Sequence, residues 1–335
     1  QDFNKSFEII MVDDASTDNG QKIVKMQNSP LIKLHSLPSN TGPSAARNVG
    51  LKIAKGEYVF FLDADDSITT CALKTLYGHA KENDFDLVYS DKANIENSRN
   101  QNENIFVHPA DKIFSNSDIT KEIKKRLYDP LYTTGLIGVT GRLIKRSIIN
   151  RNNLYFEEQL RYLEDETFSW DIMAYCKKAK YIRKQLYTYY QYPNVSSAIS
   201  DGFDRGFSVS NFKLVKRHVQ NCFECRGLSI QEAEKLADQA FIFLIISALI
   251  SYSRSMILGK VDLENGKNRR KKLIKDILRD SDVSKAIKNY SCSENEDRWI
   301  PKAIAWKFQT FLEFACNKRA KKILSIRRKA ASKLN

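Results

Sequence analysis

The fold of this chain is decided by one stretch, Tyr58-Val59-Phe60-Phe61-Leu62-Asp63-Ala64-Asp65-Asp66. Apolar residues here run directly into a group of carboxylates. A short, unbroken apolar run predicts a buried strand of a parallel sheet, and acids at its carboxyl end lie where open α/β sheets bind ligands. Clustered carboxylates suit a divalent cation, because Mg²⁺ and Mn²⁺ prefer oxygen ligands and bridge to phosphates. An acidic turn without a metal is the alternative interpretation.

The segments around this stretch alternate between strand-like and helix-like patterns. Pro43 suits the first turn of a helix, and Gly56 suits a helix end. This alternation predicts an α/β fold, with a Rossmann-like and mostly parallel sheet flanked by helices. The predicted strands are 7–12, 32–37, 58–62 and 87–89, and the predicted helices between them are one ending at Met26, 43–55 and 70–82.

The second half of the chain changes character. Residues 91–117 are polar and rich in Asn, which predicts a loop or an excursion over the site. Beyond about residue 203 the patterns become long and helical, so we predict two domains, residues 1–200 and residues 201–335. The remaining predicted elements are helices 118–127, 140–150, 165–177, 203–222, 229–258, 267–279 and 300–332, and a strand 182–190.

Charge is unevenly distributed along the 335 residues. The net charge is +14, and residues 266–335 alone carry 20 Lys and Arg against 7 Asp and Glu. Such a basic region suits a polyanion, namely a nucleic acid, an acidic glycan or an anionic membrane surface. The six cysteines show no paired spacings, which favours reduced thiols in a cytoplasmic compartment. No signal peptide is visible, and the longest apolar run, 241–250, suits a buried helix better than a membrane span.

Several short motifs follow one another in a specific order. They are Phe7-Glu8-Ile9-Ile10-Met11-Val12-Asp13-Asp14-Ala15-Ser16-Thr17-Asp18, Asn40-Thr41-Gly42, Ala46-Arg47-Asn48-Val49-Gly50, Lys55-Gly56-Glu57-Tyr58, Asp63-Ala64-Asp65-Asp66 and Leu163-Glu164-Asp165. Together they resemble glycosyltransferase family 2 over roughly residues 6–200. The resemblance implies a GT-A fold and inverting transfer of a sugar from a nucleotide-sugar. It also divides the first domain into a donor half, about 1–90, and an acceptor half, about 91–200.

Sugar transfer needs a diphosphate leaving group whose developing charge is neutralised, which a metal ion does as a Lewis acid. We predict Asp65 as the principal ligand of Mn²⁺ or Mg²⁺, with Asp63 reaching the ribose, or the metal through water. Arg47 could contact the pyrophosphate, because a guanidinium matches phosphate oxygens. A solvated helix charge is the alternative interpretation of Arg47.

The resemblance implies further contacts with the donor. It pairs Asp14 with the N–H of a uracil-like base, which makes a UDP-sugar the leading prediction. It also places Asn40, Ser16 and Ala64 in the donor-binding set. From the residues alone, Asp14 would be a turn-capping acid, and Asn40 could equally form an Asx-turn.

The acceptor hydroxyl must lose a proton as it attacks, and a carboxylate within hydrogen-bond reach is the simplest base. Asp165 matches the base of the family, and Glu164 would orient it or touch the acceptor. Capping is the alternative, because acids at a helix start stabilise the helix dipole without a catalytic role. Inversion follows from a single in-line displacement that uses no enzyme nucleophile.

The sequence departs from the family pattern in two places. The aromatic run 187–192 is followed by Ser196 and Ser197, but Gln191 and Tyr192 stand where the family often has a basic residue. Core packing is the favoured role for these tyrosines, and stacking on a sugar is the alternative. The family also begins with a strand, a loop and a helix before residue 7. Either the sequence is a fragment or a segment is omitted, and a truly missing strand would leave a sheet edge without its partner.

The C-terminal stretch 318–329 is basic and has a narrow apolar stripe. Trp299, Trp306 and several Phe residues precede it. An interfacial helix on anionic lipid has this composition, whereas a solvated helix packed on its own domain is the alternative. We therefore predict a cytoplasmic protein that can lie on the inner face of the plasma membrane, with nucleic acid an unfavoured partner.

The leading hypothesis is a metal-dependent inverting glycosyltransferase that extends a surface polysaccharide, such as a capsule, or a lipid-linked oligosaccharide. One alternative is a nucleotidyltransferase, whose usual Gly-rich, Lys-containing phosphate loop is not visible. Another is a non-enzymatic protein that binds polyanions through the basic C-terminal region. That alternative leaves the set of Asp63, Asp65 and Asp165 unexplained.

Overall fold

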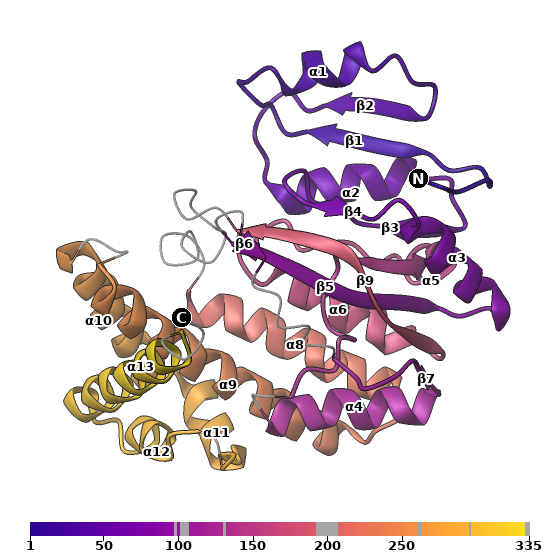
Figure 1. Ribbon diagram of the computed structural model, residues 1–335. Coiled ribbons are helices and arrows are strands. Elements are labelled where there is room, and N and C mark those ends of the chain that lie inside the picture. The colour runs from indigo at the N-terminus through magenta and orange to yellow at the C-terminus, as the bar shows by residue number, and fades with distance from the viewer. Residues whose placement is uncertain are drawn as a thin grey trace. The chain divides into compact units, whose positions relative to one another are not determined.

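The computed structural model describes residues 1–96, 99–100, 107–129, 132–191, 207–259, 263–294 and 296–331 (Figure 1). The chain forms two compact units. The first contains residues 1–123 and 134–195, and the second contains residues 124–133 and 196–335. The predicted boundary lies near residue 200, and the short segment 124–133 in the second unit was not predicted.

The first unit begins with a small parallel sheet. Strands β1 (Ile9–Asp13) and β2 (Ile32–Ser36) pair side by side, with helix α1 (Gly20–Met26) connecting them (Figure 1). Helix α2 (Pro43–Ile53) packs against β1. Gly50 lies in this contact, where a Cβ atom would be 3.7 Å from the Val12 side chain. The parallel pairing and the crossover agree with the predicted α/β alternation.

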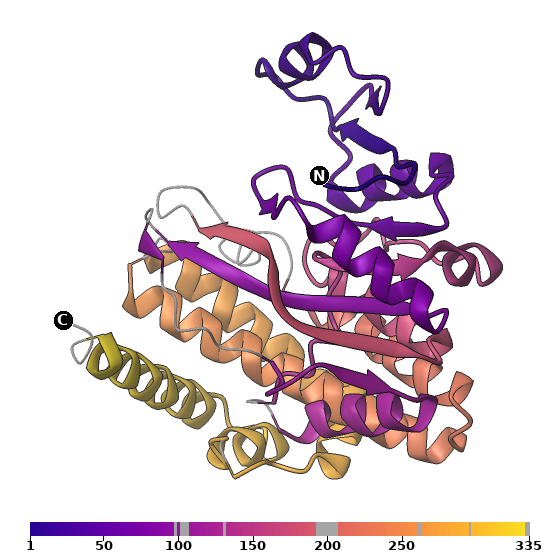
Figure 2. The same ribbon diagram turned by 45° about the vertical axis from the view of Figure 1, so that its right-hand side comes forward.

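The larger sheet of this unit is mixed. Its strand order is β3-β8-β5-β9-β4, with β6 paired to β5 and β7 paired to β9. Among the strand pairings of this sheet in the described residues, only that of β5 with β9 is parallel, and these two long strands run side by side (Figure 2). The α/β fold class is confirmed, but this sheet is mixed and mostly antiparallel where a mostly parallel sheet was predicted, because β8 lies antiparallel between β3 and β5. The strands are β3 (Tyr58–Phe60), β4 (Ser67–Ile68), β5 (Leu87–Glu96), β6 (Arg99–Asn100), β7 (Lys112–Phe114), β8 (Arg142–Lys145) and β9 (Ala179–Gln191).

Two segments differ from the prediction. Residues 140–150 were predicted as one helix, but β8 occupies 142–145 and helix α5 (Arg146–Arg151) follows it. The prediction of a helix at 142–145 is wrong, because β8 lies between β3 and β5 with Leu143 and Ile144 both buried. A short strand that is covered on both faces cannot be told from a helix by periodicity. Residues 91–117 are also more regular than a loop, since β5 continues to Glu96, β6 and β7 follow, and α4 (Asn116–Tyr128) begins here.

Both sheets have an edge without a strand partner. In the described part of the chain, β1 pairs only with β2, and β3 pairs only with β8. No residue of β1 or β3 is fully buried. Unpaired backbone groups of this kind are a ready template for another strand.

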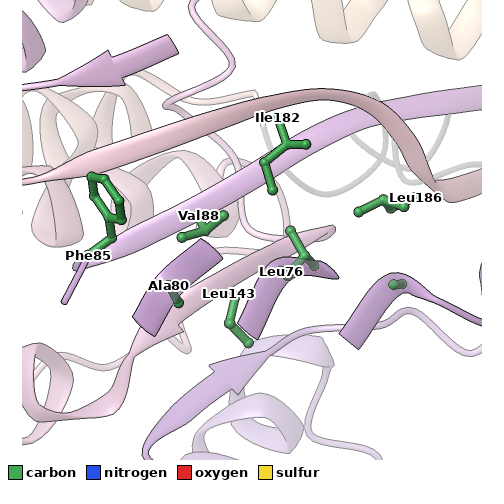
Figure 3. Packing of buried hydrophobic residues seen from close by; sticks show 8 residues of the cluster. Leu76, Ala80, Phe85, Val88, Leu143, Ile182 and Leu186 are labelled. Atoms are coloured by element: carbon green, nitrogen blue, oxygen red, sulfur yellow. The ribbon is translucent and has the colours of Figure 1, made fainter. Parts of the chain in front are cut away.

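The core of the first unit lies between the large sheet and helix α3 (Ala72–Glu82). Figure 3 shows Leu76 and Ala80 of this helix packed towards Val88, Leu143 and Ile182 of the sheet. Each fully buried leucine contributes about 2 kcal/mol through the hydrophobic effect. This packing fixes β5 and β8, which carry side chains of the site described below.

The second unit is helical. Helix α9 (Ile230–Ile257) begins at a capping box formed by Ser229 and Glu232, and the other helices pack around it. By length and composition α9 is the one described helix that could cross a membrane, although 56% of its most apolar window is buried inside the protein. The predicted helix 300–332 is broken at Lys307, whose φ is +56°. The other helices are α8 (Val209–Cys225), α10 (Leu263–Arg279), α11 (Ser281–Asn289), α12 (Trp299–Ala305) and α13 (Gln309–Ala331).

Candidate active site

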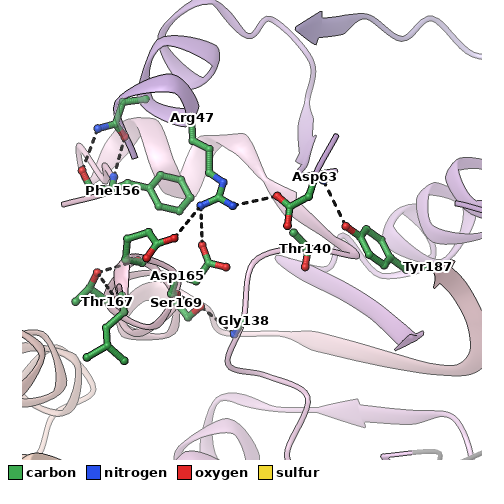
Figure 4. A network of polar contacts seen from close by, with 12 residues as sticks. Arg47, Asp63, Gly138, Thr140, Phe156, Asp165, Thr167, Ser169 and Tyr187 are labelled. Atoms are coloured by element: carbon green, nitrogen blue, oxygen red, sulfur yellow. Dashed lines mark hydrogen bonds and ion pairs between the residues drawn. The ribbon is translucent and has the colours of Figure 1, made fainter. Parts of the chain in front are cut away.

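One arginine connects the motifs that the sequence analysis singled out. The Arg47 guanidinium, on α2, lies between acids from two other parts of the first unit (Figure 4). Its Nη2 is 3.0 Å from an Asp63 oxygen, and its Nη1 is 2.9 Å from Asp165 and 3.4 Å from Glu164. The structure therefore brings four of the predicted site residues into one cluster.

The position of Arg47 is fixed by an aromatic platform. Its guanidinium carbon lies 5.3 Å from the centre of the Phe156 ring, which stacks on Phe168 at 4.0 Å. The neighbouring Asn48 is buried and holds the backbone of Phe156 at both groups, accepting from its N–H at 2.8 Å and donating to its carbonyl at 2.9 Å. Asn48 and Phe156 thus hold Arg47 in position, and neither residue was predicted to have a role.

The two acids on the other side of Arg47 come from the start of helix α6 (Glu164–Tyr175). Leu163 precedes the helix with φ at +72°, which turns the chain sharply into the first helical turn. Glu166, in the same turn, accepts from the Trp170 indole at 3.1 Å, so its partner differs from those of Glu164 and Asp165. The first turn of α6 therefore directs Glu164 and Asp165 to Arg47, whereas Glu166 is bonded to Trp170.

Burial sets the protonation behaviour of these acids. Burial raises the pKa of Asp165, and Arg47 opposes this effect while Asp63 adds to it. Burial and the charge of Asp165 likewise raise the pKa of Glu164, again against Arg47. Asp165 keeps 40% of its side chain exposed and Asp63 keeps 37%, against 17% for Arg47. Asp165 is thus an accessible carboxylate with increased basicity.

The acids after β3 form a tight turn. The Asp66 N–H donates to the Asp63 carbonyl at 3.1 Å, and the Asp66 carboxylate accepts from the Tyr187 hydroxyl and the Tyr190 N–H. Burial raises the pKa of Asp66, and the charges of Asp65 and Asp63 add to this effect. Tyr187 is therefore a polar support of the turn as well as a core residue.

Asp65 and Ala64 are exposed at the tip of this turn, and Asp65 has no hydrogen bond or ion pair to the described residues. No group of three or more His, Cys, Asp or Glu within the described ranges forms a complete set of metal ligands. Mg²⁺ and Mn²⁺ sites of phosphate-transferring type commonly use one or two carboxylates and take their other ligands from substrate phosphates and water. The free Asp65 beside Asp63 fits such an incomplete site.

Two of the remaining predicted donor residues, Asp14 and Asn40, lie together at the start of α2. The Asp14 carboxylate accepts from the N–H groups of Thr41 and Gly42, both at 2.7 Å, and the Asn40 amide donates to the Asp14 carbonyl at 3.2 Å. Asp14 therefore holds this turn, which is the role expected without the resemblance. The Ser16 N–H donates to Asp13, and Ser16 is exposed. Contact of Asp14, Asn40 and Ser16 with a donor stays a prediction.

The stretch before β8 also contributes to the site. The buried Arg142 guanidinium donates to the carbonyls of Gly135, Ile137 and Thr140, so the loop wraps around it. A Cβ atom on Gly138, whose φ is +132°, would lie 2.9 Å from this guanidinium. Thr140 pairs with Phe61 just before the acid turn. The glycines of this loop are the signal in the sequence that could have indicated an unusual turn here. The sequence does not show that the turn forms around Arg142, which follows them.

The last predicted positions lie at and after the end of β9. Gln191 ends β9, whereas Tyr192, Ser196 and Ser197 lie outside the described residues.

The first unit is thus an α/β domain with an acidic turn after one strand, opposed by a basic side chain and a second acid pair at a helix start. This combination defines the GT-A-like class of fold. The glycosyl transferase family 2 model matches residues 1–187, and the chain belongs to this family. The resemblance seen in the sequence is confirmed.

Relatives and solved structures agree with this assignment. The chain is 32% identical over 188 residues to the poly(ribitol-phosphate) beta-N-acetylglucosaminyltransferase TarP of Staphylococcus aureus, covering 55% of this chain and 52% of TarP. It is 30% identical to the cholesterol galactosyltransferase of Borreliella burgdorferi, covering 67% of this chain and 63% of that protein. The crystal structure of S. aureus TarS 1-349 in complex with UDP shares the fold, with a TM-score of 0.67, 21% identity, and coverage of 96% of this chain and 84% of that chain.

The chain spans about half, or less, of the length of the first curated relatives that it matches. Their named activities therefore apply to this chain only as proposals.

Proposed function

We propose that the protein transfers a sugar from a nucleotide-sugar to a hydroxyl group of a growing glycan or glycopolymer, with inversion at the anomeric carbon. The observation that carries this proposal is the Arg47 cluster. It joins Asp63, next to the predicted diphosphate site, to Asp165, the predicted base. A nucleotidyltransferase and a polyanion-binding protein need no second acid pair opposite the acidic turn, and the family assignment also favours glycosyl transfer.

We infer that the donor is a UDP-sugar. The support is the structural likeness to TarS, solved in complex with UDP and with UDP-GlcNAc. The acceptor would be a surface polysaccharide or capsule, a lipid-linked oligosaccharide, or a polyol-phosphate polymer. The last option is supported by relatives named as poly(ribitol-phosphate) transferases.

In the proposed reaction Asp165 takes the proton of the acceptor hydroxyl as its oxygen bonds to the anomeric carbon. The bond from that carbon to the diphosphate breaks on the opposite face, which inverts the configuration. Arg47, which also donates to Glu164, holds the Asp165 carboxylate in place, and the Phe156 ring lies against the Arg47 guanidinium. Mn²⁺ or Mg²⁺ at Asp65 and Asp63 would neutralise the charge that develops on the diphosphate.

The first test measures UDP release from common UDP-sugars by the full chain with Mn²⁺. Turnover that stops when EDTA is added is the expected result. Asp65→Ala should slow turnover by about 10- to 100-fold, because Asp63 and the diphosphate still hold part of the metal shell. Asp2→Ala, which removes an exposed acid of the same unit, should leave the rate unchanged. The UDP assignment is wrong if no UDP-sugar binds or reacts.

We further propose that the helical unit attaches the protein to an anionic membrane surface. Aromatic side chains lie exposed around the break between α12 and α13, where Trp306 is 60% exposed and Phe314 is 61% exposed. Phe311 stacks with both, at 6.4 and 6.5 Å between ring centres. Exposed lysines flank these rings, at Lys302, Lys307, Lys318, Lys321 and Lys322. Aromatic groups beside cations suit the interface of an anionic bilayer.

Co-sedimentation with vesicles tests this attachment. The full chain should bind vesicles of phosphatidylcholine with phosphatidylglycerol more tightly than phosphatidylcholine alone. The double variant Trp306→Ser/Phe314→Ser should bind about 10- to 100-fold more weakly, because two large apolar groups no longer leave water. Ile230→Ser, at another exposed apolar position of the unit, serves as the control. Equal vesicle binding by the double variant and the wild-type chain would contradict the proposal.

A further inference from the structure

A lysine that the sequence analysis did not single out lies beside the acidic turn. Lys92 belongs to β5, and its ammonium group donates to the Thr140 hydroxyl. The same nitrogen lies 4.9 Å from the centre of the Tyr187 ring. The Tyr187 hydroxyl donates to Asp66 and accepts from the backbone N–H of Asp63. Lys92 is therefore connected to the acidic turn through a single side chain.

The backbone of β5 is irregular at this point. Its register with β9 shifts on both sides of Asp91, and such a bulge bends a strand and redirects its side chains. Asp91 is buried and accepts from the Tyr181 hydroxyl and the Val107 N–H. Lys92 instead contacts Thr140. The two charged neighbours thus lie in separate polar environments, and only Lys92 lies with the acidic turn.

The Lys92 ammonium has no carboxylate partner. Within the described ranges, no Asp or Glu lies within ion-pair distance of its nitrogen, and the Thr140 hydroxyl is its one hydrogen-bond acceptor. Asp63 and Asp165, whose charges act on Lys92, are both paired with Arg47. Lys92 thus retains unused donors, although an ammonium group can make three hydrogen bonds.

The surroundings of Lys92 disfavour an isolated positive charge. The side chain is half-buried. Burial lowers the pKa of Lys92 to about 8, and the charge of Arg142 adds to this effect while Asp63 and Asp165 oppose it. Removing a charge from water is costly unless a partner replaces the lost hydration. A neutral sugar hydroxyl would leave the charge uncompensated, whereas a phosphate oxygen supplies both the acceptor and the opposite charge.

We propose that Lys92 binds a phosphate group of a substrate beside the acidic turn and the candidate base. Figure 4 draws Thr140, the hydrogen-bond partner of Lys92, beneath Asp63, and the charges of both Asp63 and Asp165 act on Lys92. The inference rests on the proposed function, which offers two sources of phosphate. One is the diphosphate of the donor, and the other is a phosphodiester of a polyol-phosphate acceptor.

The test compares the full chain with Lys92→Met, Lys92→Arg and the control Lys112→Met. Lys112 also lies over an aromatic ring, that of Phe114, but it is paired with Glu122. Calorimetry measures the Kd of UDP and of uridine in the presence of Mn²⁺. Steady-state kinetics measure the KM of a ribitol-phosphate oligomer and the KM of the UDP-sugar.

If Lys92 binds the donor, Lys92→Met should weaken UDP binding by about 10- to 100-fold and leave uridine binding unchanged, since a hydrogen bond to a charged group is lost. If Lys92 binds the acceptor, the KM of the ribitol-phosphate oligomer should rise by a similar factor at an unchanged Kd of UDP. Lys92→Arg should restore most of the loss in either case. The melting temperature of Lys92→Met should not fall, because the half-buried cation that is removed has no carboxylate partner among the described residues.

The inference is overturned if the UDP Kd and the oligomer KM of Lys92→Met both match those of the wild type. It is also overturned if Lys92→Met lowers the melting temperature and weakens uridine and UDP equally, because that result indicates a structural role. A wild-type chain that neither binds UDP nor turns over a UDP-sugar refutes the proposed function instead. The measurements on the wild-type chain therefore distinguish a failure of the Lys92 inference from a failure of the proposed function.

Discussion

Replacement of Asp165 by Asn is expected to slow sugar transfer by about 10²- to 10⁴-fold, which is the usual contribution of a general base. The amide has nearly the same shape and can still lie beside the Arg47 guanidinium, but it cannot accept a proton. Asp165 belongs to the acceptor side of the cluster, whereas Asp65 is the predicted metal ligand. The Kd of UDP should therefore stay unchanged, and the loss should be in kcat.

The pH profile provides a second measurement of the same role. A base must be deprotonated, so kcat/KM should rise with pH as Asp165 loses its proton. Because burial raises the pKa of Asp165, this rise should be centred above the ordinary aspartate value of 3.8. Asp165→Asn should lose this rise altogether, which a purely structural acid would not explain.

The matched control is Glu166→Gln, in the same helical turn. This carboxylate shares the position near the helix dipole but is bonded to Trp170 and not to Arg47. If Glu166→Gln reduces kcat as much as Asp165→Asn does, capping of α6 is the common cause and the base assignment is wrong. A loss of sugar transfer in Asp165→Asn but not in Glu166→Gln would support the assignment of Asp165 as the base.

The parts of the fold that were predictable are those encoded by local patterns. Strand β3, helix α2 and helix α6 each carry their own signals, namely an apolar run, a Pro–Gly boundary and a cluster of acids. Strand β8 was not predictable, because it is a strand only in the presence of β3 and β5 on either side. Its apolar residues satisfy either a helix or a strand until those partners are known.

The site shows the same limit at the level of side chains. Asp63, Arg47 and Asp165 could be selected from motifs, but no pattern in the sequence says that one guanidinium contacts both acids. Lys92 and Asn48 were missed because their roles depend on Thr140 and Phe156, which are distant in sequence. A polar residue in a strand carries no local mark of the partner that it will have across the fold.

Asp14 illustrates how the structure narrows a prediction based on resemblance. Its carboxylate already accepts from the N–H groups of Thr41 and Gly42 and from the Thr41 hydroxyl. The backbone N–H bonds lower the pKa of Asp14, while burial acts in the opposite direction. An ionised Asp14 thus fixes the turn before α2, and any contact with a base must use the remaining lone pairs of the carboxylate.

Arg47→Met is expected to reduce transfer by about 10²- to 10³-fold, because the acids lose the charge that positions them. It should also lower the free energy of unfolding by about 1–3 kcal/mol. Leaving acids unpaired in a fully buried site costs about 3–5 kcal/mol, and the exposure of Asp63 and Asp165 reduces that cost. Denaturant unfolding and steady-state kinetics measure the two effects.

The pH profile distinguishes this role of Arg47 from a contact with the diphosphate alone. Arg47 lowers the pKa of Asp165 against the effect of burial, so its removal should raise that pKa and move the acid limb of kcat/KM to higher pH. Lys52→Met, which removes an exposed charge of the same helix that lies over the Tyr155 ring, should leave the rate and the pH profile unchanged and lower the free energy of unfolding by less than about 1 kcal/mol. An Arg47→Met variant with weaker UDP binding but an unmoved acid limb would show that Arg47 serves the donor and does not control the base. The Arg47 guanidinium bonds both Asp63, on the donor side, and Asp165, the candidate base. If Arg47 serves both, Arg47→Met should weaken UDP binding and also move the acid limb of kcat/KM to higher pH.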